Sequence, residues 1–266
     1  MRPKFSIIMP SFNKGKFIES AINSILSQRE VDLELIVFDN LSSDSTSTVL
    51  ASISDPRLKV FVEPDNGMAH AINKGLKVAR GHVLGWLNAD DLLFPDALQR
   101  ISDKFAPDVP QLYYGHGMIL DDKDKFIRLN FCKRYSYRDL KYYSKNLWLQ
   151  PGVFWNRKAM EEVGFLRENL RYTMDVDYWM RMSRSVRLIF INDLQGVLRV
   201  YDDTITANGG QKFRDELNNE IYDLYGYERS GILLLIWSFC RKVSFVINVK
   251  IFLLWRSRGE FFLRKG

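Results

Sequence analysis

Two carboxylates stand side by side at Asp90 and Asp91, where an apolar run ends in the stretch WLNADDLLFP, residues 86–95. Adjacent negative charges raise each other's pKa and cost stability unless a cation or hydrogen-bond donors offset the repulsion. A structural interpretation is that one of them caps a helix entered near Pro95, whose positive end favours carboxylates. A chemical interpretation is that they help to hold a divalent cation, whose other ligands are phosphate oxygens and water. The surrounding elements must decide between the two.

Strands and helices alternate over the first 90 residues. Four short apolar runs predict buried strands at residues 5–9, 33–38, 58–62 and 83–87. Amphipathic stretches predict helices between them at residues 16–28, 44–53 and 69–79. The expected fold is therefore α/β, with a Rossmann-like, mainly parallel central sheet and helices on both faces.

Polar clusters follow three of these strands. They are Pro10, Ser11 and Asn13 after the first strand, Asp39 after the second, and the acidic pair after the fourth. Ligands of parallel α/β sheets bind at the carboxyl ends of the strands. We therefore expect the three clusters to converge at one edge of the sheet, which the helix-cap interpretation does not explain.

The pattern is looser beyond about residue 110. Strand candidates lie at residues 112–120, 148–155, 186–191 and 197–200, and a helix is predicted over 175–183. The sequence shows no internal repeat, low-complexity segment or Pro- or Ser-rich linker. We therefore expect one domain over residues 1–227.

Several common classes are not indicated. No GxGxxG follows the first strand, and Gly15-Lys16 lacks the upstream glycine and the Ser or Thr of a phosphate-binding P-loop. Cys132 and Cys240 lie far apart without metal-type spacing, which favours a reducing compartment and no disulfide framework. A cytoplasmic location is expected.

The net charge of +6 is concentrated at the C-terminal end. Residues 228–266 carry eight basic and two acidic side chains, and two apolar runs at 232–240 and 243–255 are interrupted by Arg241, Lys242 and Lys250. Those charges argue against a simple transmembrane helix. We expect an apolar, basic helical tail on an anionic membrane surface, and no binding of nucleic acid. The alternative is a C-terminal helix packed on the body or in a dimer.

Six short motifs, in order, resemble those of family 2 glycosyltransferases of the GT-A fold. They are IMPSFN at residues 8–13, VFD at 37–39, DNG at 65–67 with AINKG at 71–75, WLNADD at 86–91, QPGVFW at 150–155 and DVDYWMR at 175–181. The resemblance extends from about residue 5 to 205. It implies a GT-A-type sheet and transfer of a sugar from a nucleotide-sugar. It also implies that the domain at residues 1–227 has a nucleotide-binding half at about 1–110 and an acceptor half at about 111–227.

The resemblance implies a set of residues around the donor nucleotide. They are Pro10, Ser11, Asn13, Asp39, Asn66, Gly67, Asn73, Lys74 and Asp90. Asp39 is expected to hydrogen-bond the base, usually uracil, with loop capping as the alternative. Asn73 and Lys74 are expected near the nucleotide and sugar, and the alternative for both is a solvated place on a helix.

The same resemblance assigns the chemistry to three carboxylates. Asp91 is expected to ligate Mn²⁺ or Mg²⁺ across the diphosphate, and Asp90 to contact the ribose or a metal-bound water. Asp175 is expected to act as the general base that takes the acceptor's proton late, with inversion at the sugar. The alternative for Asp175 is capping of the helix that follows. Asp177 and Arg181, four residues apart, are expected to form a structural ion pair.

Gln150 and Trp155 are expected to line the donor-sugar and acceptor side, with core packing as the competing explanation. Two positions depart from the family pattern. His70 stands where many relatives carry Asp, and Tyr201 stands where many have a metal-binding His. The contacts to the donor sugar and the third metal ligand are therefore left unassigned.

The expected function is inverting, metal-dependent transfer of one sugar to a carbohydrate or polyprenyl-diphosphate-linked acceptor, and the donor is expected to be UDP-linked. The tail suggests work at the inner face of the cell membrane, as in the assembly of bacterial surface polysaccharide. The stretch from Gln195 to Arg199 lacks the Gln-x-x-Arg-Trp motif of processive synthases. One alternative is a non-catalytic scaffold, which the retained acids disfavour. Another is a sugar nucleotidyltransferase, which would normally carry a glycine-rich loop after the first strand.

Overall fold

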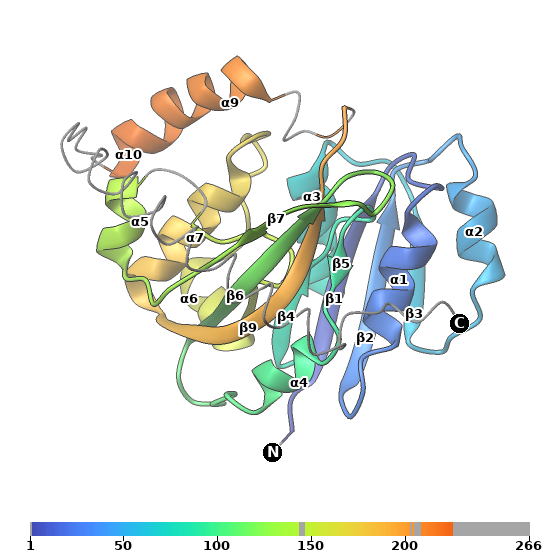
Figure 1. Cartoon of the computed structure of the whole chain (residues 1–266), viewed down its shortest axis with the longest axis horizontal. Helices are drawn as coiled ribbons and strands as arrows, with labels where there is room; N and C mark the ends of the chain where they lie inside the picture. Colours follow the sequence, from blue (N-terminus) through green and yellow to red (C-terminus); the bar gives the residue numbers. More distant parts are fainter. Residues whose placement is uncertain (1, 144–146, 203, 205–208, 226–266) are drawn as a thin grey trace. The chain divides into compact units, whose positions relative to one another are not determined.

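A computed structural model of the chain describes residues 2–143, 147–202, 204 and 209–225 (Figure 1). Its N-terminal part alternates strands and helices as the apolar pattern predicts. The elements are β1 (Lys4–Ser11), α1 (Ile18–Leu26), β2 (Asp32–Asp39), α2 (Thr46–Ser52), β3 (Leu58–Val62), α3 (Met68–Val78) and β4 (Val83–Trp86). The predicted order of four strands and three helices is confirmed.

These four strands form the parallel part of one sheet, in the order β3-β2-β1-β4. The register places Ser11, the last residue of β1, opposite Asp39, the last residue of β2. Trp86, at the end of β4, is level with Ile8 of β1. The polar residues that follow these strands therefore leave the sheet at the same edge.

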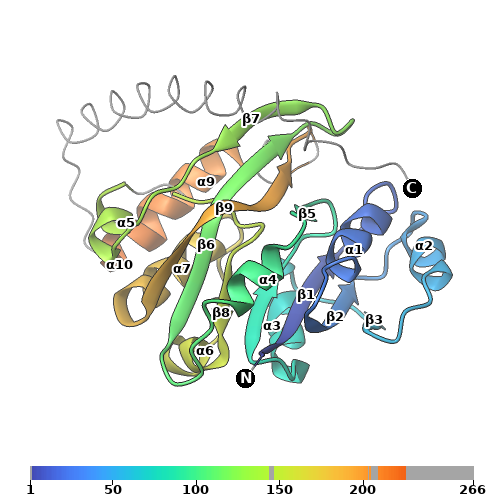
Figure 2. The same ribbon diagram turned by 60° about the horizontal axis from the view of Figure 1, so that its bottom comes forward.

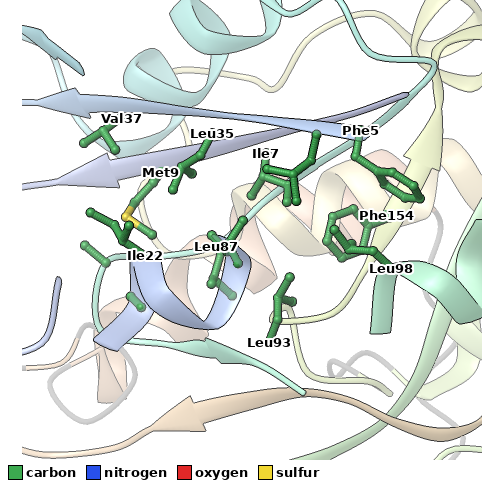
Figure 3. Packing of buried hydrophobic residues seen from close by; sticks show 14 of the residues in the cluster. Phe5, Ile7, Met9, Ile22, Leu35, Val37, Leu87, Leu93, Leu98 and Phe154 are labelled. Atoms are coloured by element: carbon green, nitrogen blue, oxygen red, sulfur yellow. The ribbon is translucent and has the colours of Figure 1, made fainter. Parts of the chain in front are cut away.

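Helices cover both faces of this part of the sheet because successive side chains of a strand point to opposite sides. Phe5, Ile7 and Met9 of β1 are fully buried in a cluster with α1 and with α4 (Ala97–Ser102). Figure 3 shows these side chains pointing into the cluster. Ile8 points to the other face, where a Cβ on Gly75 of α3 would come within 2.5 Å of it. The absence of a side chain at Gly75 lets α3 lie directly on the strand.

The second half of the chain adds short strands and further helices. The remaining elements are β5 (Leu92–Leu93), β6 (Gln111–Leu120), β7 (Phe126–Asn130), α5 (Tyr137–Tyr143), β8 (Phe154–Asn156), α6 (Arg157–Val163), α7 (Met174–Ser185), β9 (Arg187–Arg199), α9 (Gly210–Glu216), η1 (Leu217–Tyr222) and α10 (Asp223–Tyr225). Strand β9 joins the two strands expected at 186–191 and 197–200, and the strand expected at 148–155 is limited to β8.

The expectation of a mainly parallel sheet is wrong for this half. The sheet continues β4-β8-β6-β9-β5, in which only β6 and β9 are parallel, while β7 pairs with β6 in the antiparallel sense. Figure 2 shows β6 and β9 running side by side. Antiparallel neighbours need no crossover helix, so the rule that predicts a parallel sheet from alternating strands and helices does not apply to residues 111–199. The fold is α/β with a mixed sheet.

An aromatic core joins β4, β8 and α7. Trp86, Trp155 and Trp179 are almost completely buried, and the rings of Trp86 and Trp179 stack 5.1 Å apart with an angle of 6° between their planes. Trp155 meets both rings edge-on. Aromatic pairs in such arrangements add about 0.5–1.5 kcal/mol beyond the area that they bury. This packing holds α7 against the end of β4.

The chain divides into two units, residues 1–226 and 227–266. The basic, apolar tail predicted for residues 228–266 lies outside the described residues and stays a prediction. Within the part of the chain that the structure describes, no helix combines the length and apolar character needed to span a bilayer.

Candidate active site

A cavity of about 890 Å³ opens where the strands of the parallel part end. Its walls come from five segments of the chain, namely residues 10–14 at the end of β1 and just after it, Asn40 after β2, 65–69 at the start of α3, 88–91 after β4, and 168–171 with Met174 before and in α7. Leu198, Arg199 and Thr204 complete the lining. Of the residues expected from sequence, those on the walls are Pro10, Ser11, Asn13, Asn66, Gly67, Asp90 and Asp91.

Asp39 supports the wall after β1 from behind. It is 1% exposed, and its Oδ1 accepts hydrogen bonds from the hydroxyls of Ser11 at 2.9 Å and Ser42 at 2.6 Å. Its Oδ2 accepts from the backbone N–H of Ser42 at 2.9 Å. Asp39 itself does not line the cavity, whereas its neighbour Asn40 does. This arrangement agrees with the loop-capping alternative.

Asn13 joins the same pair of loops. Its backbone lies in the left-handed region at φ 52°, which Asn tolerates better than most residues. The side-chain Oδ1 of Asn13 accepts from the backbone N–H of Ser43 at 2.9 Å, and the backbone N–H of Asn13 donates to the Ser42 hydroxyl at 2.8 Å. The loop after β1 is therefore fixed before any ligand arrives.

Asp90 and Asp91 have different surroundings. Asp91 is 1% exposed, and its oxygens accept from the backbone N–H of Arg199 at 2.9 Å and from Asn88 Nδ2 at 3.1 Å. Burial, followed by the charge of Asp90, raises the pKa of Asp91 well above its ordinary value. Asp90 Oδ2 accepts from Lys14 Nζ and from the Tyr201 hydroxyl, both at 2.7 Å. Protein donors thus offset part of the repulsion between the two carboxylates.

The helix-cap interpretation of the acidic pair is wrong. Helix α4 begins at Ala97, and its N-cap residue is Asp96, five or more positions further along the chain. Asp90 and Asp91 lie instead in the turn after β4, on the cavity wall. Among the residues with described positions, no group of three or more His, Cys, Asp or Glu side chains could hold a metal ion.

The loop before α3 forms a second wall. Gly67 donates its N–H to Asp65 Oδ1 at 2.8 Å, and Asn66 donates its N–H to His70 Nδ1 at 3.0 Å. Gly67 has φ +118°, a conformation that other residues rarely adopt, although space around its Cα is open. The conformation explains why glycine is needed at this turn.

Asn73 and Lys74 do not line the cavity. Asn73 is buried, exchanges hydrogen bonds with the backbone N–H and C=O of Leu166, and donates to Glu168 Oε1. It therefore fastens the loop that carries the wall at 168–171. Lys74 pairs with Glu63 at 2.7 Å. The alternative of a solvated place on a helix is wrong for both residues, because Asn73 is buried and the side chain of Lys74 is mostly buried.

Asp175 lies in the first turn of α7, beside the wall residue Met174, and is half-buried. Its Oδ1 accepts from the backbone N–H of Val176 at 2.8 Å. Thr173, not Asp175, occupies the N-cap position, while the Asp175 carboxylate satisfies the free N–H of Val176 in the first turn of α7. Asp175 itself is not on the cavity wall; it follows Met174, which is.

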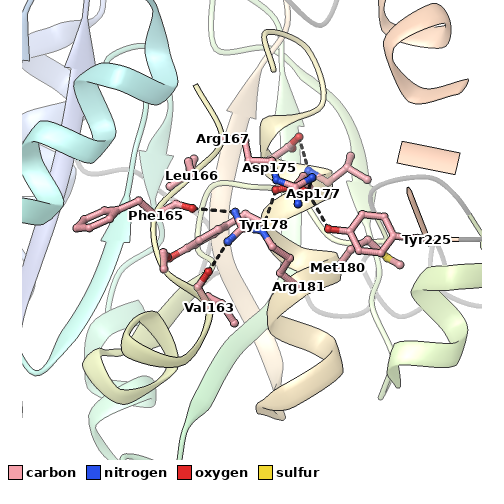
Figure 4. A network of polar contacts seen from close by, with 12 residues as sticks. Val163, Phe165, Leu166, Arg167, Asp175, Asp177, Tyr178, Met180, Arg181 and Tyr225 are labelled. Carbon is pink, nitrogen blue, oxygen red and sulfur yellow. Dashed lines mark hydrogen bonds and ion pairs between the residues drawn. The ribbon is translucent and has the colours of Figure 1, made fainter. Parts of the chain in front are cut away.

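A buried polar network anchors this end of α7 (Figure 4). Asp177 is fully buried and accepts from Arg181 Nε at 2.9 Å and from the Tyr225 hydroxyl at 2.7 Å, with Arg167 Nη1 at 3.1 Å. Arg181 also donates to the backbone carbonyls of Val163 and Phe165. The predicted ion pair of Asp177 and Arg181 is confirmed, and it ties α7 to α6 and to α10.

Gln150 and Trp155 lie behind the site. Gln150 Nε2 donates to the carbonyl of Trp86 at 2.8 Å, and Trp155 is fully buried in the aromatic core. Neither is on the cavity wall, which agrees with the packing alternative for Trp155.

Sequence reasoning missed several wall residues. Lys14 and Arg199 were not expected at the site, because their roles there depend on hydrogen bonds to Asp90 and Asp91, which are far away in the chain. Glu168, Asn169 and Arg171 belong to a loop without a motif, so no sequence signal could have found them.

The model of the family described as "Glycosyl transferase family 2" matches residues 6–164. An uncharacterized glycosyltransferase of Rickettsia typhi is 27% identical over an alignment of 216 residues, which covers 77% of this chain and 66% of that protein. The chondroitin synthase of Pasteurella multocida is 33% identical over 108 residues, 40% of this chain and 11% of that enzyme. The chain therefore spans about two thirds of the length of the Rickettsia relative and about a tenth of the length of the chondroitin synthase.

Two solved structures have a similar fold. S. aureus TarS 1-349 in complex with UDP-GlcNAc gives a TM-score of 0.60 at 18% identity, covering 76% of this chain and 60% of that one. The mannosyltransferase PcManGT of Pyrobaculum calidifontis, in complex with GDP-Man and Mn²⁺, gives 0.59 at 20% identity, covering 86% and 66%. Because the family model covers more than half of the chain and the fold agrees, this protein belongs to glycosyl transferase family 2, with a GT-A-like fold.

Proposed function

We propose that the protein is an inverting glycosyltransferase that moves a single sugar from a UDP-linked nucleotide-sugar to a carbohydrate or lipid-linked saccharide acceptor. The observation that carries the proposal is the convergence on one cavity of Ser11, of the loop at 65–67 and of the Asp90–Asp91 pair. Asp175 follows directly on a further wall residue of this cavity. The nucleotide-sugar complexes of two structural neighbours support the same class of donor.

The acidic pair fits a divalent cation that arrives with the donor. Mg²⁺ and similar ions are commonly held by one or two carboxylates, with substrate phosphates and water as further ligands. Asp90 and Asp91 supply two carboxylates in adjacent positions on the cavity wall, and a cation between them would offset the repulsion of their charges. Asp91 is proposed as the ligand of Mn²⁺ or Mg²⁺, as expected from the sequence. Asp90, expected at the ribose or a metal-bound water, is here proposed as a second carboxylate for the same cation because it lies on the same wall. The Mn²⁺ in one structural neighbour supports the choice of ion. When bound, the cation neutralises charge on the departing nucleoside diphosphate.

The residues of the chain divide the remaining work. The loops tied by Asp39 and Asn13 form a fixed wall for the nucleotide. Asp175 accepts the proton of the acceptor hydroxyl as its oxygen forms a bond to the anomeric carbon. The bond from that carbon to the diphosphate breaks on the opposite side, and its electron pair leaves with the nucleoside diphosphate. Attack opposite the leaving group inverts the configuration.

The place of the reaction is proposed from the tail. Eight basic side chains and two apolar runs in residues 228–266 suit a peripheral position on the inner face of the cell membrane. A polyprenyl-diphosphate-linked saccharide presented at that surface would be the acceptor, in the assembly of bacterial surface polysaccharide.

The test is a panel of nucleotide-sugars with Mn²⁺ and membrane-extracted acceptors, scored by mass. The proposal expects a gain of one hexose, N-acetylhexosamine or deoxyhexose, with release of UDP. The matched control is Asp175→Asn, which should bind UDP without transferring a sugar. A folded native protein that modifies no acceptor with any donor, or an Asp175→Asn variant as active as the native protein, would contradict the proposal.

A further inference from the structure

A lysine occupies the side of Asp90 that faces the cavity. Lys14 Nζ donates to Asp90 Oδ2 at 2.7 Å and to the Tyr201 hydroxyl at 2.6 Å, and that hydroxyl donates to the same carboxylate oxygen at 2.7 Å. The three groups therefore form a closed triangle. Lys14 and Asp90 both line the cavity, and their side chains are 24% and 10% exposed.

The backbone at Lys14 is fixed, so only its side chain can move. The N–H of Lys14 donates to Thr46 Oγ1 and the N–H of Gly15 to Asp44 Oδ2, both at 2.9 Å. The Tyr201 ring is held by Phe17, with the ring centroids 5.0 Å apart. The ammonium group is thus carried on a flexible stem between two anchored partners.

Two cations cannot share this carboxylate oxygen without strong repulsion. A divalent ion on Asp90 Oδ2 would come within a few ångströms of the Lys14 ammonium, in a site with little solvent to screen the charges. The further charges around Asp90 are those of Asp91 beside it and of Arg199, whose Nη1 donates to the Asp90 carbonyl. One more negative group, such as a diphosphate, would let both cations stay in the site, with the metal ion on Asp90 and the ammonium on the diphosphate.

We propose that Lys14 is an internal counter-ion that occupies the cation position on Asp90 until the donor arrives. The diphosphate then draws the Lys14 ammonium from Asp90, so that the metal ion binds with the nucleotide and not before it. The inference rests on the proposed function, because it takes a nucleoside diphosphate as the ligand. Lys14 thereby sets the order in which the nucleotide and the metal ion bind. Once released from Asp90, its ammonium offsets negative charge on the leaving diphosphate.

The chain offers a matched control two residues away. Lys16 carries the same charge on the same segment, but its Nζ pairs with Asp122 at 2.7 Å and its side chain is 60% exposed, outside the cavity lining. Lys14→Gln removes the counter-ion, whereas Lys16→Gln removes an equal charge without changing Asp90. Thermal unfolding checks that both variants fold.

The experiment measures Mn²⁺ binding to the full chain by the electron paramagnetic resonance signal of free Mn²⁺, with and without UDP. Lys14→Gln should bind Mn²⁺ alone about tenfold more tightly than the native protein, because a nearby charge commonly shifts an ionic equilibrium by one or more powers of ten. Lys16→Gln should bind Mn²⁺ like the native protein. With UDP present, the native affinity should rise by at least about tenfold.

Equal or weaker Mn²⁺ binding by Lys14→Gln than by the native protein would overturn the inference. Native protein that binds Mn²⁺ as tightly without UDP as with it would also overturn it, even if the variant did not fold. Neither result depends on turnover. A failure to find any sugar transfer would instead count against the proposed function and leave these binding results standing.

Discussion

Asp177 offers a quantitative test of how the end of α7 is held. The residue is fully buried and receives Arg181, Arg167 and the Tyr225 hydroxyl on its two oxygens. The substitution Asp177→Asn leaves the guanidinium of Arg181 without its carboxylate in a mostly buried place. Removing one partner of a buried ion pair costs about 3–5 kcal/mol. Because native domains are stable by about 5–15 kcal/mol, the loss should be easy to measure.

The assay is urea unfolding followed by the fluorescence of the buried tryptophans that pack against α7. Tyr225→Phe removes a single hydrogen bond to the same carboxylate and should cost about 1 kcal/mol. Asp122→Asn, at the exposed ion pair with Lys16, is the control and should leave the free energy of unfolding unchanged within error. A loss of less than about 1 kcal/mol for Asp177→Asn, the range of surface pairs, would refute the reasoning.

Three further substitutions probe the fold around the site. Burial alone would raise the pKa of Glu34, but hydrogen bonds led by that from Lys59 lower it from 4.5 to about 2. The contribution of Glu34 to stability is therefore complete above its pKa in the unfolded chain and is lost as the pH falls through about 2. Glu34→Gln should lower the free energy of unfolding by about 3 kcal/mol at neutral pH. It should also make that free energy depend less on pH in the acid range. Gly67→Ala should cost about 1–3 kcal/mol in chemical unfolding, because alanine is strained at φ +118°; an unchanged midpoint would count against it. Asn73→Ala leaves the backbone groups of Leu166 unpaired and should cost about 2 kcal/mol and raise the KM for the acceptor; an unchanged KM would show that the loop does not depend on this tie.

The parallel part of the fold could be predicted because each strand there is an apolar run followed by an amphipathic helix. The runs at 5–9 and 58–62 correspond to β1 and β3 with little change. The second half could not be predicted in the same way. Strand β8 has only three residues, and the interruption between 191 and 197 is an irregularity within β9, opposite Gly115 to Gly117 of β6. Such features depend on pairing partners and leave no period in the sequence.

The candidate site also has a part that could be predicted from the sequence and a part that could not. The acidic pair could be placed because it follows a strand, so the topology alone brings it to this edge of the sheet. The loop at 65–67 could be placed only because its DNG motif resembles that of the family. Lys14 could not be recognised, since its role depends on Asp90 and Tyr201, which are 76 and 187 residues away in the chain. Asn73 was expected at the nucleotide, but its amide is used by Leu166, 93 residues further on.

The central claim is that Asp175 performs the proton transfer while other residues of the same cavity bind the nucleotide. The measurement is UDP affinity by calorimetry together with UDP release from the donor that the panel identifies, for the native protein and Asp175→Asn. The account predicts a UDP affinity within about twofold of native and a turnover at least about a hundredfold lower, the usual weight of a general base. A turnover close to native in Asp175→Asn, or a loss of UDP binding together with activity, would contradict it.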